Sequence, residues 1–171
     1  LIIIQFVVTA GAFGQNLEWA LATETATGGR CHSQAIAVSD SGHVYIAGTF
    51  TGTVDFDLGP GTHNLTATTP VGGWEQNYFL QKMDSTGHLL WVVAFGEAFN
   101  VSDNPFNPTF DINNIDLIVD ENGSIYCSFE NFRSADLDPG PDIVNAGIGG
   151  ILLKLNSDGA YVWHSFAPNN D

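Results

Sequence analysis

The sequence predicts an all-β protein built from two repeated antiparallel units. Trp19, Trp91 and Trp163 stand 72 residues apart, each at the third position of a short strand-like run. Short apolar runs alternate with turns rich in Gly, Asn and Asp, and no convincing stretch carries apolar residues at helical spacing. A fixed period of one supersecondary unit is typical of an array whose units bury their faces against one another.

The repeat extends well beyond the tryptophans. Residues 36–64 align without gaps to 117–145, and residues 80–91 align to 152–163. The shared residues are Val38/Val119, Gly42/Gly123, Tyr45/Tyr126, Asp55/Asp136, Asp57/Asp138, Gly59/Gly140, Pro60/Pro141 and Asn64/Asn145, then Leu80/Leu152, Lys82/Lys154, Ser85/Ser157, Gly87/Gly159 and Trp91/Trp163. Most are turn formers or core apolar residues, and the loops between the aligned blocks absorb the differences in length, as loops in repeat arrays do.

Each unit is expected to contain four strands. In the first unit these are residues 34–38, 43–48, 78–83 and 88–95, joined pairwise into hairpins by turns that end in glycine. The second unit repeats the pattern, with turns at 121–123 and 156–159. A lone four-stranded sheet leaves a face wet, and radial stacking of such sheets solves this problem. The pattern therefore favours a partial β-propeller of two four-stranded antiparallel blades.

Three segments of the first unit also resemble a known family. They are Ala35-Ile-Ala-Val-Ser-Asp-Ser-Gly-His-Val-Tyr-Ile-Ala-Gly-Thr-Phe, Gly52-Thr-Val-Asp-Phe-Asp-Leu-Gly-Pro-Gly and Phe79-Leu-Gln-Lys-Met-Asp-Ser-Thr-Gly-His-Leu-Leu-Trp. They are similar to the SBBP-type bacterial β-propeller repeat, a relative of NHL-type blades. The second unit matches less closely, since Phe129 replaces Gly48 and Asn131 replaces Phe50. The resemblance implies a secreted or cell-surface protein, of a kind that often carries a C-terminal domain for type IX secretion.

The first residues predict an export signal. Leu1–Val8 is apolar except for Gln5, and the small-residue site Ala12-Phe13-Gly14 follows. The alternative is a buried strand, but the run is too short to span a membrane and lacks strand-like alternation. The expected divisions are 1–14 signal peptide remnant, 15–33 outer strand of a missing last blade and linker, 34–97 first blade, 98–113 linker, 114–167 second blade and 168–171 start of a truncated continuation. We thus interpret the chain as an N-terminal fragment with Leu17–Ala22 as an isolated outer strand.

Composition excludes some partners. Nineteen acidic residues against four basic ones give a formal charge of −15, and the basic residues do not cluster. Phosphate-backbone binding is therefore not expected, and we predict no nucleic-acid partner and no membrane span in the mature chain. Acidity of this kind suits a soluble exported protein. The two cysteines, Cys31 and Cys127, would join different blades if paired, and Cys127 is interpreted as a small core residue.

One motif has the chemistry of a metal site. Asp55 and Asp57, repeated as Asp136 and Asp138, are alternate acids followed by Gly and Pro, and alternate residues of an extended segment point to the same side. Such carboxylates are candidate Ca²⁺ ligands, although calcium wants six to eight oxygens and each motif supplies two, with Asp142 a third in the second copy. The interpretation that we favour is a loop fixed by Asp side chains that accept backbone N–H bonds. No other cofactor is expected.

The sequence leaves three classes of function open. The first is a non-catalytic binding or scaffold module whose ligand is an unknown extracellular protein or polysaccharide. The second is a hydrolase or lyase acting on extracellular polymer with its active site in other blades, and the third is a calcium-stabilised adhesive array. No catalytic residue is predicted, and a repeated acid pair argues against glycoside hydrolysis because a catalytic site needs to be built only once. Fold alone does not decide among the three.

Overall fold

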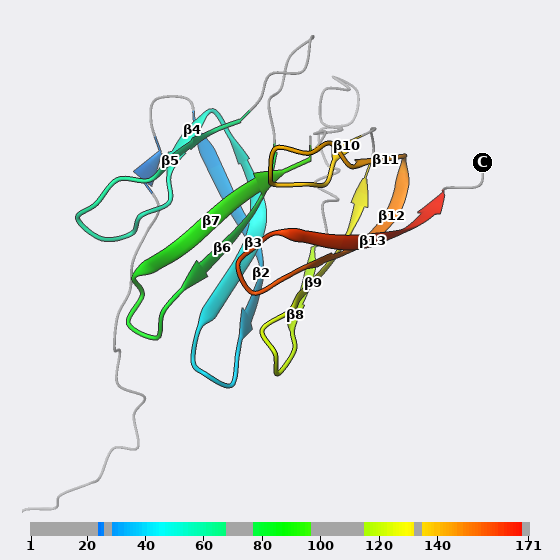
Figure 1. Ribbon diagram of the computed structural model, residues 1–171. Helices are drawn as coiled ribbons and strands as arrows, with labels where there is room; N and C mark the ends of the chain where they lie inside the picture. The colour runs from blue at the N-terminus through cyan, green and yellow to red at the C-terminus, as the bar shows by residue number, and fades with distance from the viewer. Residues whose placement is uncertain (1–23, 26–28, 68–76, 97–114, 132–134, 169–171) are drawn as a thin grey trace, which may run out of the picture.

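The computed structural model describes residues 24–25, 29–67, 77–96, 115–131 and 135–168, and within these ranges the protein is all-β, as the sequence predicts. Two four-stranded antiparallel sheets form the bulk of the molecule, and two small sheets lie at one end of them (Figure 1). The expected outer strand at residues 17–22, the export signal and the linker at 98–113 lie outside the described residues.

The first large sheet is a meander in the order β2-β3-β6-β7. Its strands are β2 (Arg30–Val38), β3 (Val44–Thr51), β6 (Asn77–Met83) and β7 (Leu89–Phe95). The β2–β3 and β6–β7 turns contain Gly42 and Gly87 at φ of 81° and 87°, where glycine avoids the clash that a Cβ would suffer. Strand β2 starts at Arg30, four residues before the expected Gln34, because a bulge between Ser33 and Ala35 lets residues 30–33 keep pairing with β3.

The second large sheet repeats this arrangement in the order β8-β9-β12-β13. Its strands are β8 (Asp116–Val119), β9 (Ile125–Asn131), β12 (Gly149–Leu155) and β13 (Tyr161–Pro168). The register irregularity between Lys154 and Leu155 falls at the position that aligns with the one between Lys82 and Met83. Two four-stranded antiparallel units are therefore confirmed, and the structure adds that a bulge falls at the same position in both.

The small sheets come from the segments that carry the repeated Asp motifs. Strands β4 (Thr53–Asp55) and β5 (Asn64–Thr66) form a hairpin, and β1 (Glu24–Thr25) adds to it by pairing with β4. In the second unit the equivalent hairpin is β10 (Ala135–Asp136) with β11 (Asn145–Ala146). The sequence predicts loops here, because strands of two or three residues carry too few residues to show alternation.

The main core lies between the two large sheets. Tyr45, Leu80 and Phe95 from the first sheet meet Ile125, Cys127, Phe129, Ile151, Leu153 and Leu155 from the second, and all of them are buried. Strands β2 and β8, the first strand of each sheet, are in contact (Figure 1). A second cluster, containing Phe50, Val54, Phe56 and Phe79, fills the space between the first sheet and its small sheet. The first large sheet is thus packed on both of its faces, and the second is packed on the face toward the first.

The difference between Gly48 and Phe129 follows from this stacking. A Cβ on Gly48 would lie 2.0 Å from the carbonyl oxygen of His32, so that position admits only glycine. Phe129 instead fills the space between the large sheets, with its ring centroid 4.5 Å from that of Tyr78 and 5.9 Å from that of Phe95. The two units diverge at this position because different elements cover it.

A backbone hydrogen bond joins one unit to the next at the end of the stack. Gly96, which follows β7, donates its N–H to the carbonyl oxygen of Asp136 at 2.6 Å. In the first unit, Glu24 of β1 pairs with Asp55 of β4. Glu24 precedes Gly96 by the same 72 residues that separate the tryptophans, and Asp55 aligns with Asp136. Glu24 of β1 therefore meets the first unit at the position where Gly96, just after β7, meets the second.

Candidate binding face

The two large sheets expose equivalent faces to different surroundings. The face of the first sheet that points toward the second sheet is called the covered face. Its side chains are those of Ala35, Ala37, Tyr45, Ala47, Tyr78, Leu80, Lys82, Trp91, Val93 and Phe95. In the second sheet the aligned residues form what we call the open face, and they are Asp116, Ile118, Tyr126, Ser128, Gly150, Leu152, Lys154, Trp163, Ser165 and Ala167. The register that places each set on one face is the same in both sheets.

Aligned side chains on the two faces differ strongly in their exposed fraction. Leu80 is 0% exposed on the covered face, whereas the aligned Leu152 is 40% exposed on the open face. Ile118 and Trp163 are 66% and 39% exposed. A sheet face with several large apolar side chains in water is a typical interaction surface.

One end of the open face keeps the aromatic and basic residues of the covered face. Lys154 Nζ lies 4.9 Å from the centroid of the Tyr126 ring, and that ring lies edge-on to Trp163 at 6.3 Å. The pKa of Lys154 is raised, chiefly by its hydrogen bond with the Tyr126 side chain. We call Tyr126, Lys154 and Trp163 the open-face triad.

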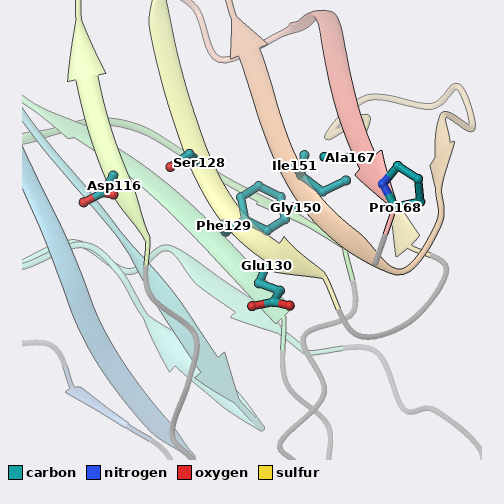
Figure 2. A pocket seen from close by; sticks show the side chains of 8 residues that line it. All are labelled: Asp116, Ser128, Phe129, Glu130, Gly150, Ile151, Ala167 and Pro168. Atoms are coloured by element: carbon teal, nitrogen blue, oxygen red, sulfur yellow. The ribbon is translucent and has the colours of Figure 1, made fainter. Parts of the chain in front are cut away.

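The other end of the open face is a hollow bordered by acids (Figure 2). It has a volume of about 490 Å³ and is lined by Asp116, Ser128, Phe129, Glu130, Gly150, Ile151, Ala167 and Pro168, which come from all four strands of the sheet. Gly150 and Ala167 replace Tyr78 and Phe95 of the covered face, and Asp116 replaces Ala35. The hollow exists because small side chains and a carboxylate stand where the first sheet has aromatic rings and a methyl group.

The repeated Asp motifs form hydrogen-bonded loops in both units. Asp55 Oδ1 accepts the N–H groups of Asp57 at 3.0 Å and His63 at 2.7 Å, and Asp57 Oδ1 accepts that of Gly59 at 2.9 Å. A Cβ on Gly61 would lie 2.0 Å from Asp57 Oδ2, so the loop wraps closely around this carboxylate. Each of these carboxylates therefore has one oxygen engaged by the backbone of its own loop.

The second loop repeats this geometry. Asp136 Oδ1 accepts the N–H groups of Asp138 at 3.1 Å and Val144 at 2.8 Å, and Asp138 Oδ1 accepts that of Gly140 at 2.7 Å. The hydrogen bonds supply the structural role expected for these acids. Within the described part of the chain, no three His, Cys, Asp or Glu side chains gather as a metal site would require.

Apart from Lys154 on the open face, the titratable groups with shifted pKa values lie in two kinds of place. Burial raises the pKa of the Cys127 thiol to about 12 and, with a contribution from Glu130, raises that of the Tyr78 hydroxyl. Asp84 and Asp120 sit in exposed turns. A hydrogen bond from the Thr86 side chain is the main cause that lowers the pKa of Asp84 to about 2, and the backbone N–H of Ser124 is the main cause that lowers that of Asp120. Among the described residues, these shifted groups do not form an acid–base pair.

The two cysteines lie on different large sheets. Cys127 lies on β9 in the core between the sheets, Cys31 lies on β2 beside the second cluster, and no disulfide links the two. The stretches that the structure describes contain no helix of the length and apolarity that a membrane crossing demands. The open face was missed by sequence reasoning, because the alignment of Leu80 with Leu152 and of Trp91 with Trp163 identifies equivalent positions but does not show which of them is covered.

Comparisons with known proteins return no matches. No protein-family model matches the chain, and neither the curated proteins nor the solved structures contain a match.

Proposed function

We propose that this chain is part of a secreted or cell-surface β-propeller that serves as a non-catalytic binding or scaffold module. The observation that carries the proposal is the pair of equivalent faces, one covered by the next sheet and one open. A repeat whose faces are covered in turn by the following unit extends by adding units, and radial closure is a common way to end such a stack. Glu24 meets Asp55 at the position where Gly96 meets Asp136 in the second unit. This match supports a further sheet on the side of the first unit that faces away from the second sheet.

The distribution of titratable groups supports a binding role over catalysis. Catalytic groups need shifted pKa values and a partner within hydrogen-bonding reach in a cleft. Here the Cys127 thiol and the Tyr78 hydroxyl are raised by burial in the core, and Asp84 and Asp120 are lowered by their own turns. These four shifts come from burial and from turn hydrogen bonds, and that of Lys154 comes chiefly from its hydrogen bond with Tyr126 within the same sheet. The acidic surface suits solubility outside the cell.

Binding and catalysis are separated by one assay. The chain is incubated with insoluble cellulose, chitin and xylan, and both co-sedimentation and newly released reducing ends are measured. The proposal expects no release of reducing ends, whether or not the chain sediments with a polymer. Release that increases with protein concentration, and that disappears on substitution of a single acidic residue, would replace the binding module by an enzyme.

Export is tested separately by mass spectrometry of the N-terminal peptide from protein recovered from the culture medium. The apolar run followed by Ala12-Phe13-Gly14 predicts that the mature chain starts near Gln15. Recovery of Leu1–Phe13 still joined to the residues that follow would contradict a cleaved signal. This measurement does not depend on the ligand.

A further inference from the structure

The covered face binds a turn of the next sheet through two side chains. Lys82 Nζ donates a hydrogen bond to the carbonyl oxygen of Ser157 at 3.2 Å. A Cβ on Gly159 would lie 3.2–3.4 Å from atoms of the Trp91 indole, so the turn backbone lies closely against that ring. Gly159 also has a φ of 82°, which favours glycine on conformational grounds. The turn at residues 156–159 is therefore recognised by an ammonium and an indole together.

The open-face triad has the same internal geometry as the residues that bind this turn. Lys82 Nζ lies 5.3 Å from the Tyr45 ring centroid and Lys154 Nζ lies 4.9 Å from that of Tyr126. Both tyrosine rings lie edge-on to their tryptophan at 6.3 Å. Because these contacts lie within one sheet, they are present on the open face without an occupant. The site for a turn is thus preorganised there, which lowers the cost of binding.

The acidic hollow adds a second requirement for the occupant. On the covered face, Tyr78 and Phe95 contact the ring of Phe129 from the next sheet. On the open face Gly150 and Ala167 leave that space empty, and the exposed carboxylate of Asp116 borders it. A longer side chain is needed to fill the hollow, and a positive charge on it would complement the acid.

We propose that the open face is the docking site of a further sheet of the same repeat, whose last turn has the form Asn/Asp-Ser-x-Gly and whose residue at the position of Phe129 is a long basic one. The triad recognises the turn, and the hollow receives the basic side chain. The inference rests on the proposed function, because it names the element that continues the stack. It commits to a sheet in the same polypeptide as the occupant.

The test supplies such a sheet. A chain is built in which residues 97–168, one full period, are added again after Pro168, in a Cys31→Ser background. If the added sheet docks, its own Cys127 becomes buried at the new junction, as Cys127 is in the parent chain. Its reaction with a thiol reagent then slows to the rate of the parent Cys127. In parallel, the Trp163 of the original unit is followed by ¹⁹F NMR after 5-fluorotryptophan labelling, and its resonance is expected to lose solvent exposure.

Substitutions in the extended chain test the two parts of the site. Lys154→Met in the original unit removes the ammonium and keeps the aliphatic stem, and it is expected to restore reactivity to the added Cys127. The same substitution in the parent chain is the matched control and is expected to leave the melting temperature unchanged. Phe129→Arg in the added copy should slow the thiol reaction further, whereas Phe129→Glu should speed it by placing a carboxylate beside Asp116.

The proposal is overturned if the added Cys127 reacts as a free thiol while Trp163 keeps its exposure, because the sheet then fails to dock. It is also overturned if Arg and Glu at the added position 129 behave alike. The turn-recognition step is tested in the parent chain alone, where Lys82→Met is expected to lower the melting temperature by about 2–4 °C. No shift there would remove the basis for the triad. Release of polymer products would contradict the proposed binding function instead. Failure of the docking proposal and failure of the proposed function are therefore distinguishable.

Discussion

The covered face of the first sheet and the open face of the second carry aligned residues in the same register, yet they differ in exposure. Tyr45 is 1% exposed and Leu80 is 0% exposed, whereas Leu152, which aligns with Leu80, is 40% exposed. Both sheets keep the Lys–Tyr and Tyr–Trp contacts. What differs is the neighbour, so in this chain burial is a property of the stack and not of the sequence of one unit.

Truncation of the aligned leucines is expected to show the largest difference between the covered and open faces. Leu80→Ala is expected to lower the free energy of unfolding by about 2–5 kcal/mol, because it removes a fully buried side chain and leaves a cavity. Leu152→Ala is expected to cost less than about 1 kcal/mol, because the side chain it shortens is already part-solvated. Urea unfolding of both variants measures the difference. Equal costs would show that something covers the open face in solution.

A second test uses the buried thiol of Cys127, which stands where the first sheet has Ile46. Burial raises the folded-state pKa of the thiol to about 12, against roughly 8.5 for an exposed thiol. Above about pH 8.5 the unfolded chain loses this proton and the folded chain keeps it, so stability falls as pH rises, by up to about 1.4 kcal/mol per pH unit. The stability from this group is fully present below pH 8.5.

Cys127→Ala is the matched variant for this pH effect. It is expected to lower stability at pH 7, because it opens a small cavity, and to flatten the dependence between pH 8.5 and 10. Above that range the buried Tyr78 hydroxyl adds its own loss of stability in both proteins. Urea titrations at half-unit intervals measure the slope. Parallel slopes for the two proteins would contradict the burial of the thiol.

The Asp loops, unlike the sheet faces, are expected to be equivalent in the two units. Asp55→Ala and Asp136→Ala each remove an acceptor for two backbone N–H groups, at a cost of about 1–2 kcal/mol. Asp55→Asn and Asp136→Asn keep the oxygen and are expected to cost less. Thermal unfolding of the four variants measures this. A cost confined to one unit would show that the loops have diverged in role.

Chelation is expected to have the smallest effect. If Asp55, Asp57, Asp136 and Asp138 hold calcium, a chelator lowers the melting temperature, and the doubled Asp57→Asn, Asp138→Asn variant loses that sensitivity. We expect little shift, because the loops are closed by their own hydrogen bonds. A large chelator-induced shift that the doubled variant abolishes would assign calcium to these loops.

The strands and turns of the large sheets were predictable from the sequence, whereas the neighbours that pack against each sheet were not. The two hairpins of each unit were predictable because Gly42, Gly87, Gly123 and Gly159 mark turns that require a positive φ. The β4–β5 and β10–β11 hairpins were not predicted, since strands this short leave no alternating pattern. The Asp residues of these segments were predictable as loop-formers, because an Asp two residues before an N–H is a common turn.

The open face was beyond prediction from one unit alone. Leu80 and Leu152 look identical in sequence, and only the position of the neighbouring sheet makes one a core residue and the other a surface residue. The hollow likewise depends on Gly150 and Ala167 lying on the same face of the sheet as Asp116, with β9 between them, which needs the register. Alignment of the two units identifies the positions, and the structure decides their environment.

The meander connection of each large sheet also bears on how the chain is made. The strands of each large sheet pair in chain order, and the longer connections, from β3 to β6 and from β9 to β12, hold the small hairpins. A sheet can therefore form soon after its last strand is synthesised. The covered face then stays exposed until the following sheet has been synthesised. At typical synthesis rates a period of 72 residues takes roughly 4–14 s. During that interval Tyr45, Leu80 and Phe95 are exposed on the nascent chain, and a chaperone that recognises apolar β-surfaces would find its target there.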